Sequence, residues 1–247
     1  MIILKRVAAF FDIDGTLYRE GLITEVFKKM IKYEIIHPKR WYNEVRPEYL
    51  KWDNRTGDYD DYLLKMAKIY IEAIKGLHKY QVEFIARNVV EQKGDRVYTY
   101  TRNRIKWHKE QGHLIVTVSG SPIELVKEMS LKHGFDDFRG SVYELDDNEI
   151  YTGEVRPMWD SKNKKKAIAE LIEKYDIDIN KSYAYGDTTG DLSMFQMMRY
   201  PICVNPTREL LSKISKDEEV REKINIIVER KDVIYKLKPD NIDILDV

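Results

Sequence analysis

Four aspartates follow short apolar segments of this 247-residue chain, at positions where their carboxylates could meet. Asp12 comes directly after one apolar segment, and Asp14 lies two positions later. Asp187 follows another such segment, and Asp191 lies four positions beyond it. Carboxylates that gather in one place repel one another unless a cation lies between them. Because hard oxygen ligands favour Mg²⁺ or Ca²⁺, the four aspartates predict a divalent metal site.

The same residues could support a reaction at phosphorus. Asp12 can act as a nucleophile, because an aspartyl-phosphate intermediate divides a difficult displacement into two easier steps. Asp14 can protonate the leaving oxygen and later deprotonate water. Phosphate oxygens also need donors. Ser119 and the backbone amide of Gly120 precede a predicted helix and are candidates, and a lysine of residues 162–166 (KNKKK) could supply positive charge.

These residues need a scaffold that brings distant parts of the chain to one edge. Apolar runs predict buried strands at residues 7–11, 114–118, 182–185 and 201–204, with a fifth candidate at 224–228. Helical patterns cover residues 123–133 and 164–175, and turn signals within 141–158 predict a hairpin. Strands that alternate with helices predict an α/β fold with a doubly wound parallel sheet, which binds ligands at the carboxyl ends of its strands.

The segment between the first strand and the next core helix has a different pattern. Residues 18–98 show helical periodicity and no comparable strand-like run. We therefore expect a core formed by residues 1–18 and 99–247, and a smaller helical cap formed by residues 19–98. Aromatic residues are frequent in the cap and are expected to form its packed interior. They include Trp41, Tyr42, Tyr49, Trp52, Tyr59 and Tyr62.

The composition excludes several classes of function. Basic and acidic residues number 42 each, so no net charge attracts the chain to nucleic acid or to an anionic membrane. The single cysteine, Cys203, excludes an internal disulfide and multi-cysteine metal sites, and it favours a reducing, cytoplasmic location. No apolar run approaches the roughly 18 residues of a membrane span. No Gly-x-x-x-x-Gly-Lys-Ser/Thr motif occurs, and the five histidines lack metal-ligand spacing.

Three segments resemble the motifs of the haloacid dehalogenase superfamily. They are residues 10–17 (FFDIDGTL), 118–122 (VSGSP) and 186–192 (GDTTGDL). The phosphoserine-phosphatase-like branch is most similar, because SGSP, YTGE at 151–154 and SYAYGD at 182–187 recur there. The resemblance implies a Rossmann-like core with an inserted helical cap. It also implies a Mg²⁺-dependent phosphatase that acts on a small phosphorylated metabolite, with phosphoserine-like substrates among the candidates.

The resemblance also implies a role for each site residue. Asp12 is the nucleophile and Asp14 the acid and base. Ser119, Gly120 and one lysine bind phosphate, and the branch's lysine aligns with Lys164, while Lys162 and Lys165 stay open as alternatives. Asp12, Asp187 and the main-chain carbonyl of Asp14 hold Mg²⁺, with Asp191 close by or bound through water.

Two other functions are compatible with these motifs. A phosphotransferase or phosphomutase would pass the phosphoryl group from Asp12 to an alcohol. A non-catalytic binding module is disfavoured, because such a chain usually loses an aspartate of the first motif. The substrate of phosphoserine phosphatase is read by a cap glutamate and an arginine. Here Glu20 lies near the expected place without clear register, and Arg46 and Arg55 lack a matching context.

Overall fold

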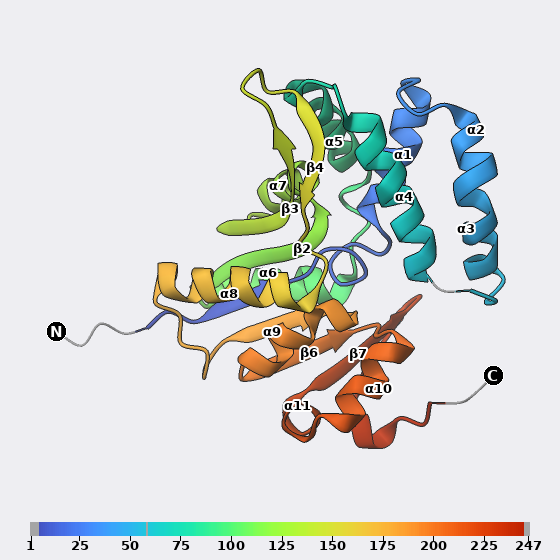
Figure 1. Ribbon diagram of the computed structural model, residues 1–247. Helices are drawn as coiled ribbons and strands as arrows, with labels where there is room; N and C mark the ends of the chain where they lie inside the picture. The colour runs from blue at the N-terminus through green and yellow to red at the C-terminus, as the bar shows by residue number, and fades with distance from the viewer. Residues whose placement is uncertain (1–4, 58, 245–247) are drawn as a thin grey trace.

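The computed structural model describes residues 5–57 and 59–244, and its centre is one eight-stranded sheet (Figure 1). The strands are β1 (Ala8–Phe11), β2 (Leu114–Pro122), β3 (Asp137–Leu145), β4 (Tyr151–Arg156), β5 (Tyr183–Gly186), β6 (Tyr200–Val204), β7 (Asn225–Arg230) and β8 (Val233–Leu237). Their order in the sheet is β4-β3-β2-β1-β5-β6-β7-β8. The six inner strands run parallel, and β4 and β8 are antiparallel to their neighbours. The predicted doubly wound α/β fold is confirmed.

Strand β1 occupies the middle of the sheet because all four of its residues are apolar and fully buried. Phe11 pairs with Thr117 of β2 on one side and with Tyr185 of β5 on the other. These three strands therefore end at the same edge of the sheet. The chain segments that follow them, which contain the predicted site residues, meet at that edge.

Helices cover both faces of the sheet (Figure 1). Ala8 and Phe10 face α8 (Ser161–Tyr175) and three shorter helices, α9 (Leu192–Met197), α10 (Arg208–Lys216) and α11 (Glu218–Lys223). Ala9 and Phe11 face the other side, which is covered by α6 (Thr99–Glu110) and α7 (Ile123–His133). This alternation is the period of two expected for a strand that is buried on both faces. Two short 3-10 turns, η2 (Thr189–Asp191) and η3 (Pro239–Asn241), complete this part.

Residues 19–98 form a group of helices beside the sheet (Figure 1). They are α1 (Leu22–Lys32), α2 (Pro38–Arg40), the π-helical turn η1 (Trp41–Val45), α3 (Arg46–Asp53), α4 (Tyr59–Ile74) and α5 (Lys79–Lys93). Helix α5 packs on α7, and α4 packs on β4. The division of the chain into a core (1–18 and 99–247) and a cap (19–98) stays a prediction.

Aromatic rings pack together inside this helical group. Trp52 stacks on Tyr62 with the ring centres 5.9 Å apart, and Tyr49 and Tyr59 lie against both rings. Trp41 contacts Phe27 and Tyr49. Tyr42 differs from the expectation of a packed interior, because it is 62% exposed.

A hairpin of β3 and β4 links the sheet to the helical group. It confirms the hairpin expected within residues 141–158, although β3 begins earlier and also pairs parallel to β2. At its tip, the Gly76 amide donates to the Tyr151 carbonyl at 2.9 Å, and the Tyr151 amide donates to the Leu77 carbonyl at 3.0 Å. The Lys79 amide donates to the Glu149 carbonyl at 2.8 Å. The sheet and the helical group are thus joined by backbone hydrogen bonds as well as by side-chain packing.

Two element boundaries and one additional strand differ clearly from the expectations. Strand β2 continues through Ser119–Pro122, which we expected to form a turn, because β2 bulges after Val118 and Pro122 then pairs with Ser141 of β3. Strand β8 was not expected, and four of its five residues are exposed, so it lacks the apolar signal of a buried strand. Helix α8 begins at Ser161 rather than 164, because the Asp160 side chain accepts the Asn163 amide at 2.8 Å and caps the helix there.

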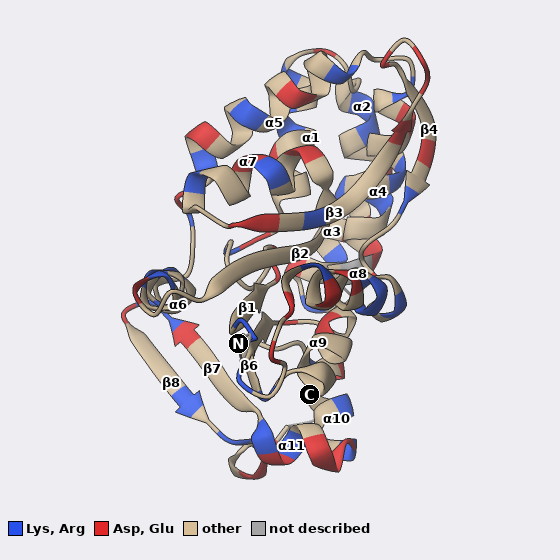
Figure 2. Cartoon of the chain, turned by 90° about the vertical axis from the view of Figure 1, so that its left-hand side faces the viewer, with Lys and Arg blue, Asp and Glu red and all other residues tan. Residues whose placement is uncertain are grey.

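The outer surface carries charges of both signs. Figure 2 shows basic and acidic segments interspersed along the outer helices, in line with the equal numbers in the composition. Within residues 5–57 and 59–244, none of the helices is both long and apolar enough to cross a membrane.

Candidate active site

Three of the predicted aspartates meet at the carboxyl edge of the sheet. Asp12 follows β1, Asp187 follows β5, and Asp191 lies in the turn η2 before α9. One carboxylate oxygen from each lies within 4.8 Å of the others, and all three side chains are buried. The structure thus brings together residues that are about 180 positions apart, as strand topology predicts.

Lys164 is the buried cation of the site. It lies in the first turn of α8 and is 3% exposed, whereas Lys162 and Lys165 are exposed. Its Nζ atom donates to Asp12 Oδ1 at 2.8 Å and to Asp191 Oδ1 at 2.6 Å. Lys164 is therefore the member of the lysine run that contacts the aspartates, and its role in phosphate binding stays a prediction.

Backbone geometry holds the two aspartates after β5. Asp191 Oδ2 accepts the amides of Asp187 and Thr188 at 3.0 and 3.2 Å, which closes the turn between them. Asp187 Oδ1 accepts the Thr16 hydroxyl at 3.0 Å. Gly15 has a φ of +77°, and a Cβ atom built there would lie 1.9 Å from Asp187 Oδ2. Only glycine leaves room for Asp187 at this point of the first motif.

Asp14 lies beside this cluster, and other groups hold its carboxylate. Its Oδ1 atom accepts the Leu22 amide at the start of α1 at 2.8 Å, and Oδ2 accepts the Ser121 hydroxyl at 2.5 Å. The contact with Ser121 was not predicted, because it depends on the continuation of β2 past Ser119. Asp14 thus connects the first motif, the second motif and the first helix of the cap segment.

Ser119 and Gly120 lie at the edge of the sheet where they were predicted. Ser119 is fully buried, and its hydroxyl accepts the Ser121 amide at 3.3 Å. Gly120 packs against Trp159, since a Cβ atom built on it would lie 2.9 Å from Trp159 Cβ and 3.1 Å from Trp159 Cα. Their contacts with phosphate stay predictions.

Burial dominates the electrostatics of the site. It raises the pKa of Asp12 to about 7, with the nearby Lys164 opposing the rise and Asp191 and Asp14 adding to it. Burial also raises the pKa of Asp187 well above its usual range, and the charges of Asp12 and Asp191 act in the same direction. For Lys164, burial favours the neutral form, but Asp12 and Asp191 outweigh it and raise the pKa. One ammonium group is thus shared among more than one carboxylate.

The donor set fits a divalent cation. Three buried carboxylates supply hard oxygen ligands, and a single lysine does not neutralise them. Such ligands suit Mg²⁺ better than metals that prefer nitrogen or sulfur.

A buried aromatic network supports the strands below the site, and it was missed in the sequence. The rings of Phe11 and Tyr185 stack with centres 4.1 Å apart. The Tyr185 hydroxyl accepts the Arg104 Nε–H at 3.0 Å and lies 2.9 Å from His108 Nε2. His108 Nδ1 lies 2.8 Å from His113 Nδ1. The helical context of His108 gave no sign of this, because its partners lie on β5 and in the loop before β2.

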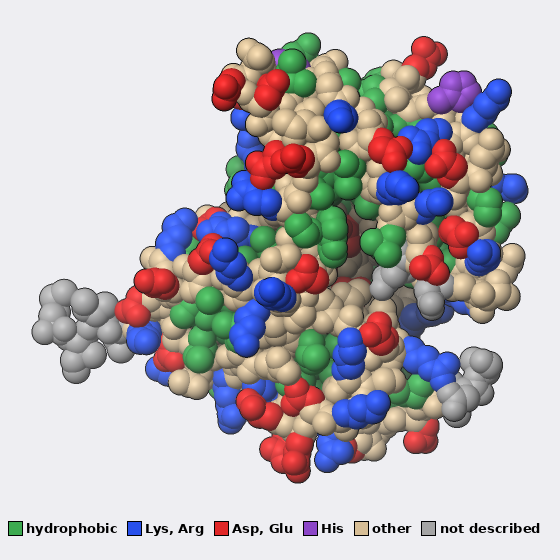
Figure 3. All heavy atoms as spheres, viewed as in Figure 1, with side chains coloured by type: hydrophobic (Ala, Val, Ile, Leu, Met, Phe, Trp, Pro, Cys, Tyr) green, Lys and Arg blue, Asp and Glu red, His purple; other side chains and the backbone are tan. Residues whose placement is uncertain are grey.

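The cap residues suggested as substrate readers make other contacts. Glu20 forms an ion pair with Arg96 at 2.9 Å. Arg46 is exposed, and Arg55 is exposed and lies over the Trp52 ring. Figure 3 shows a hollow between the helical group and the lower half of the molecule.

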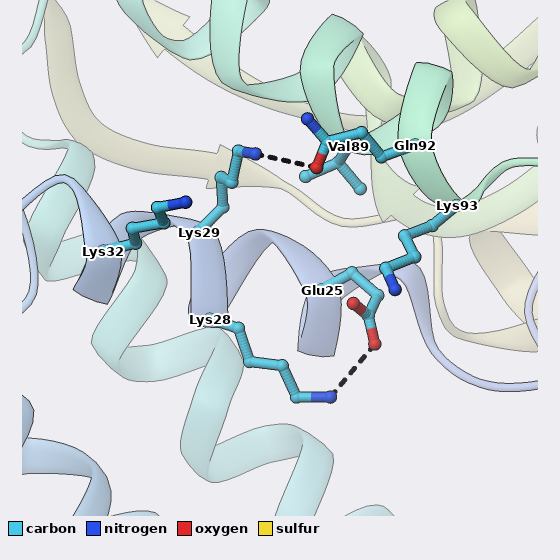
Figure 4. Close-up of a pocket in the computed structure, with 7 residues that line it drawn as sticks. All are labelled: Glu25, Lys28, Lys29, Lys32, Val89, Gln92 and Lys93. Atoms are coloured by element: carbon cyan, nitrogen blue, oxygen red, sulfur yellow. Dashed lines mark hydrogen bonds and ion pairs between the residues drawn. The ribbon is translucent and has the colours of Figure 1, made fainter.

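A second hollow lies between α1 and α5, away from the aspartates (Figure 4). It is lined mainly by Lys28, Lys29, Lys32 and Lys93, with Glu25 and Gln92. Lys28 binds Glu25 at 3.0 Å, and Lys29 binds Gln92 at 2.9 Å. Lys29, Lys32 and Lys93 lie in the last turns of their helices, where positive charge stabilises the helix dipole. This position explains these lysines without a ligand.

The fold and the site together define an α/β protein with buried carboxylates and one buried lysine at the carboxyl edge of a parallel sheet. The family model of haloacid dehalogenase-like hydrolases matches residues 9–196, and the chain belongs to that family. The resemblance seen in the three motifs and the assignment as a hydrolase are confirmed.

Relatives support this assignment. The chain is 27% identical over 209 residues to an "Inhibition of morphological differentiation protein" of Streptomyces azureus, covering 84% of this chain and 74% of that protein. It is 25% identical over 211 residues to a "Probable phosphatase" of Mycobacterium tuberculosis, covering 85% of this chain and 72% of that protein. A phosphoserine phosphatase solved as a phospho-aspartyl intermediate analogue has a similar fold, with a TM-score of 0.56 and 19% identity over 93% of this chain and 96% of that chain.

Proposed function

We propose that this protein is a Mg²⁺-dependent phosphomonoester hydrolase that forms an aspartyl phosphate on Asp12. The observation that carries the proposal is the buried cluster of Asp12, Asp187 and Asp191, in which Lys164 binds Asp12 and Asp191. The substrate is a small phosphorylated metabolite. A Mg²⁺ ion held by Asp12, Asp187, Asp191 and the Asp14 carbonyl would neutralise negative charge on the carboxylates and the phosphate.

The two aspartates of the first motif have different environments that suit different tasks. Lys164 binds Asp12 Oδ1, so Asp12 Oδ2 is the oxygen available for attack. Burial raises the pKa of Asp14, which favours the protonated acid, although hydrogen bonds from Ser121 and Leu22 oppose the rise. A raised pKa helps an aspartic acid to act as a general acid.

The reaction then proceeds in two steps. Asp12 Oδ2 forms a bond to phosphorus, the bond from phosphorus to the alcohol oxygen breaks, and the Asp14 proton passes to that oxygen. A water molecule next gives a proton to Asp14 and attacks phosphorus, and the bond from phosphorus to Asp12 breaks to release phosphate. Lys164 stays bound to Asp12 Oδ1 and orients the nucleophile.

The test is phosphate release from a panel of phosphomonoesters with Mg²⁺. We expect the wild-type protein to release phosphate and Asp12→Asn to lose this activity. Asp147→Asn, an exposed change in the hairpin, is the matched control and should behave like the wild type. The proposal fails if the wild type releases no phosphate, or if Asp12→Asn is as active as Asp147→Asn.

A further inference from the structure

The side chain of Tyr59 points from the helical group toward the site. Tyr59 is the first residue of α4, and its hydroxyl lies 3.1 Å from the place where a Cβ atom on Gly21 would stand. The next residue, Leu22, donates its amide to Asp14 Oδ1 at 2.8 Å. The Tyr59 hydroxyl thus lies beside Gly21, and the next residue, Leu22, supplies the backbone amide that holds Asp14.

The ring of Tyr59 is fixed, but its hydroxyl makes no hydrogen bond to any other residue that the structure describes. The ring centre lies 5.0 Å from that of Trp52 and 5.8 Å from that of Tyr62. Tyr62, one turn further along α4, differs because its hydroxyl lies 3.1 Å from Thr24 Oγ1. The neighbouring rings fix the position of Tyr59, and its hydroxyl is available to donate a hydrogen bond to a ligand.

The surrounding charges determine what this hydroxyl can bind. Burial raises the pKa of Tyr59 well above its ordinary value, and Asp14, Tyr62, Asp187 and Glu20 add to the rise. The hydroxyl therefore keeps its proton and donates. A carboxylate on the substrate would be repelled by Asp14 and Asp187. Arg96, the ion-pair partner of Glu20, is already engaged. A neutral acceptor, such as an alcohol hydroxyl, suits the position.

We propose that Tyr59 determines specificity by donating a hydrogen bond to a hydroxyl group on the alcohol part of the substrate. This inference rests on the proposed phosphatase function, in which Asp14 protonates the ester oxygen. The alcohol part must then lie on the Asp14 side of the phosphate, which is the side that the Tyr59 hydroxyl approaches. The substrate class is that of phosphomonoesters of diols and polyols, with a free hydroxyl next to the ester carbon.

The experiment compares 2-hydroxyethyl phosphate with ethyl phosphate, which lacks the hydroxyl. The ratio of kcat/KM between variant and wild type is measured for each ester, so differences in intrinsic reactivity cancel. Tyr59→Phe should lower kcat/KM for 2-hydroxyethyl phosphate about 3- to 10-fold, the effect of one lost hydrogen bond, and for ethyl phosphate less than about 2-fold. Tyr62→Phe is the matched control and should affect both esters by the same factor.

The inference is overturned if Tyr59→Phe changes kcat/KM for both esters equally or for neither. A general loss of structure would reduce both equally, so the difference between the esters separates substrate contact from folding. If the wild type hydrolyses ethyl phosphate but Tyr59→Phe does not discriminate, only this inference fails. If the wild type hydrolyses no phosphomonoester, the proposed function fails with it.

Discussion

Replacement of Lys164 by methionine removes the ammonium group and keeps a side chain of similar length. In the wild type, that group makes two charge-assisted hydrogen bonds, at 2.8 Å to Asp12 and at 2.6 Å to Asp191. The side chain is 3% exposed, so water does not replace these bonds. The variant leaves Asp12, Asp187 and Asp191 buried together without a cation from the protein.

The size of the effect follows from this burial. Removal of one partner of a buried ion pair costs about 3–5 kcal/mol of unfolding free energy. In a protein of this size, each kcal/mol changes Tm by about 2–4 °C, so Lys164→Met should melt roughly 6–20 °C lower than the wild type.

The assay is thermal unfolding in a metal chelator and again with Mg²⁺. Lys162→Met is the matched control, because Lys162 is exposed in the same helical turn, and it should cost less than about 0.5 kcal/mol. Added Mg²⁺ should raise the Tm of Lys164→Met more than that of the wild type, because a cation relieves the repulsion among the carboxylates. If Lys164→Met and Lys162→Met melt together in chelator, the charge balance inferred for the site is wrong.

Two further predictions concern the turn after β1 and the network below it. Gly15→Ala would place a methyl group 1.9 Å from Asp187 Oδ2, and the displaced carboxylate should lower kcat/KM about 100-fold. Gly112→Ala, with a similar φ of +70° and open space, should keep its activity, and equal activities would contradict the steric argument. Burial, with Arg104 and His113, lowers the pKa of His108 to about 3. As the pH falls, the His108 side chain is therefore protonated in the unfolded chain at a higher pH than in the folded protein. The contribution of neutral His108 to the free energy of unfolding is complete above about pH 6.5, and about 2 kcal/mol of it is lost between pH 7 and 5. Measured by urea unfolding, His108→Gln should lose less unfolding free energy than the wild type between pH 7 and 5. An equal loss in both proteins would show that His108 is not the group responsible.

Strands β1, β2, β5 and β6 were predictable because they are buried on both faces. Residues 7–11 and 201–204 form nearly continuous apolar runs, and such runs indicate parallel strands whatever surrounds them. The edge strand β8 is mostly exposed and takes its structure from pairing with β7, which periodicity does not reveal. The continuation of β2 through Ser119 depends in the same way on pairing with Ser141.

The aspartates of the site were predictable because Asp12 and Asp187 directly follow strands, and Asp14 and Asp191 lie two and four positions further along. The contacts that tune them were not, because they join residues far apart in the chain. Ser121 reaches Asp14 only after β2 extends past its apolar run. A structural contact away from the aspartates was hidden in the same way, because Glu229 of β7 accepts the Thr99 and Tyr100 amides at the start of α6, 130 and 129 positions away. No local capping pattern in residues 98–101 could indicate it.

The hydrogen bonds at the tip of the β3–β4 hairpin restrict how the helical group can move relative to the sheet. They tie Gly76, Leu77 and Lys79, between α4 and α5, to a strand of the sheet. If the helical group moves away from the sheet, this joint acts as a fixed hinge, and the widest displacement occurs at the opposite end of α4. That end begins at Tyr59, so such a motion would carry the Tyr59 hydroxyl away from Asp14, and the reverse motion would return it.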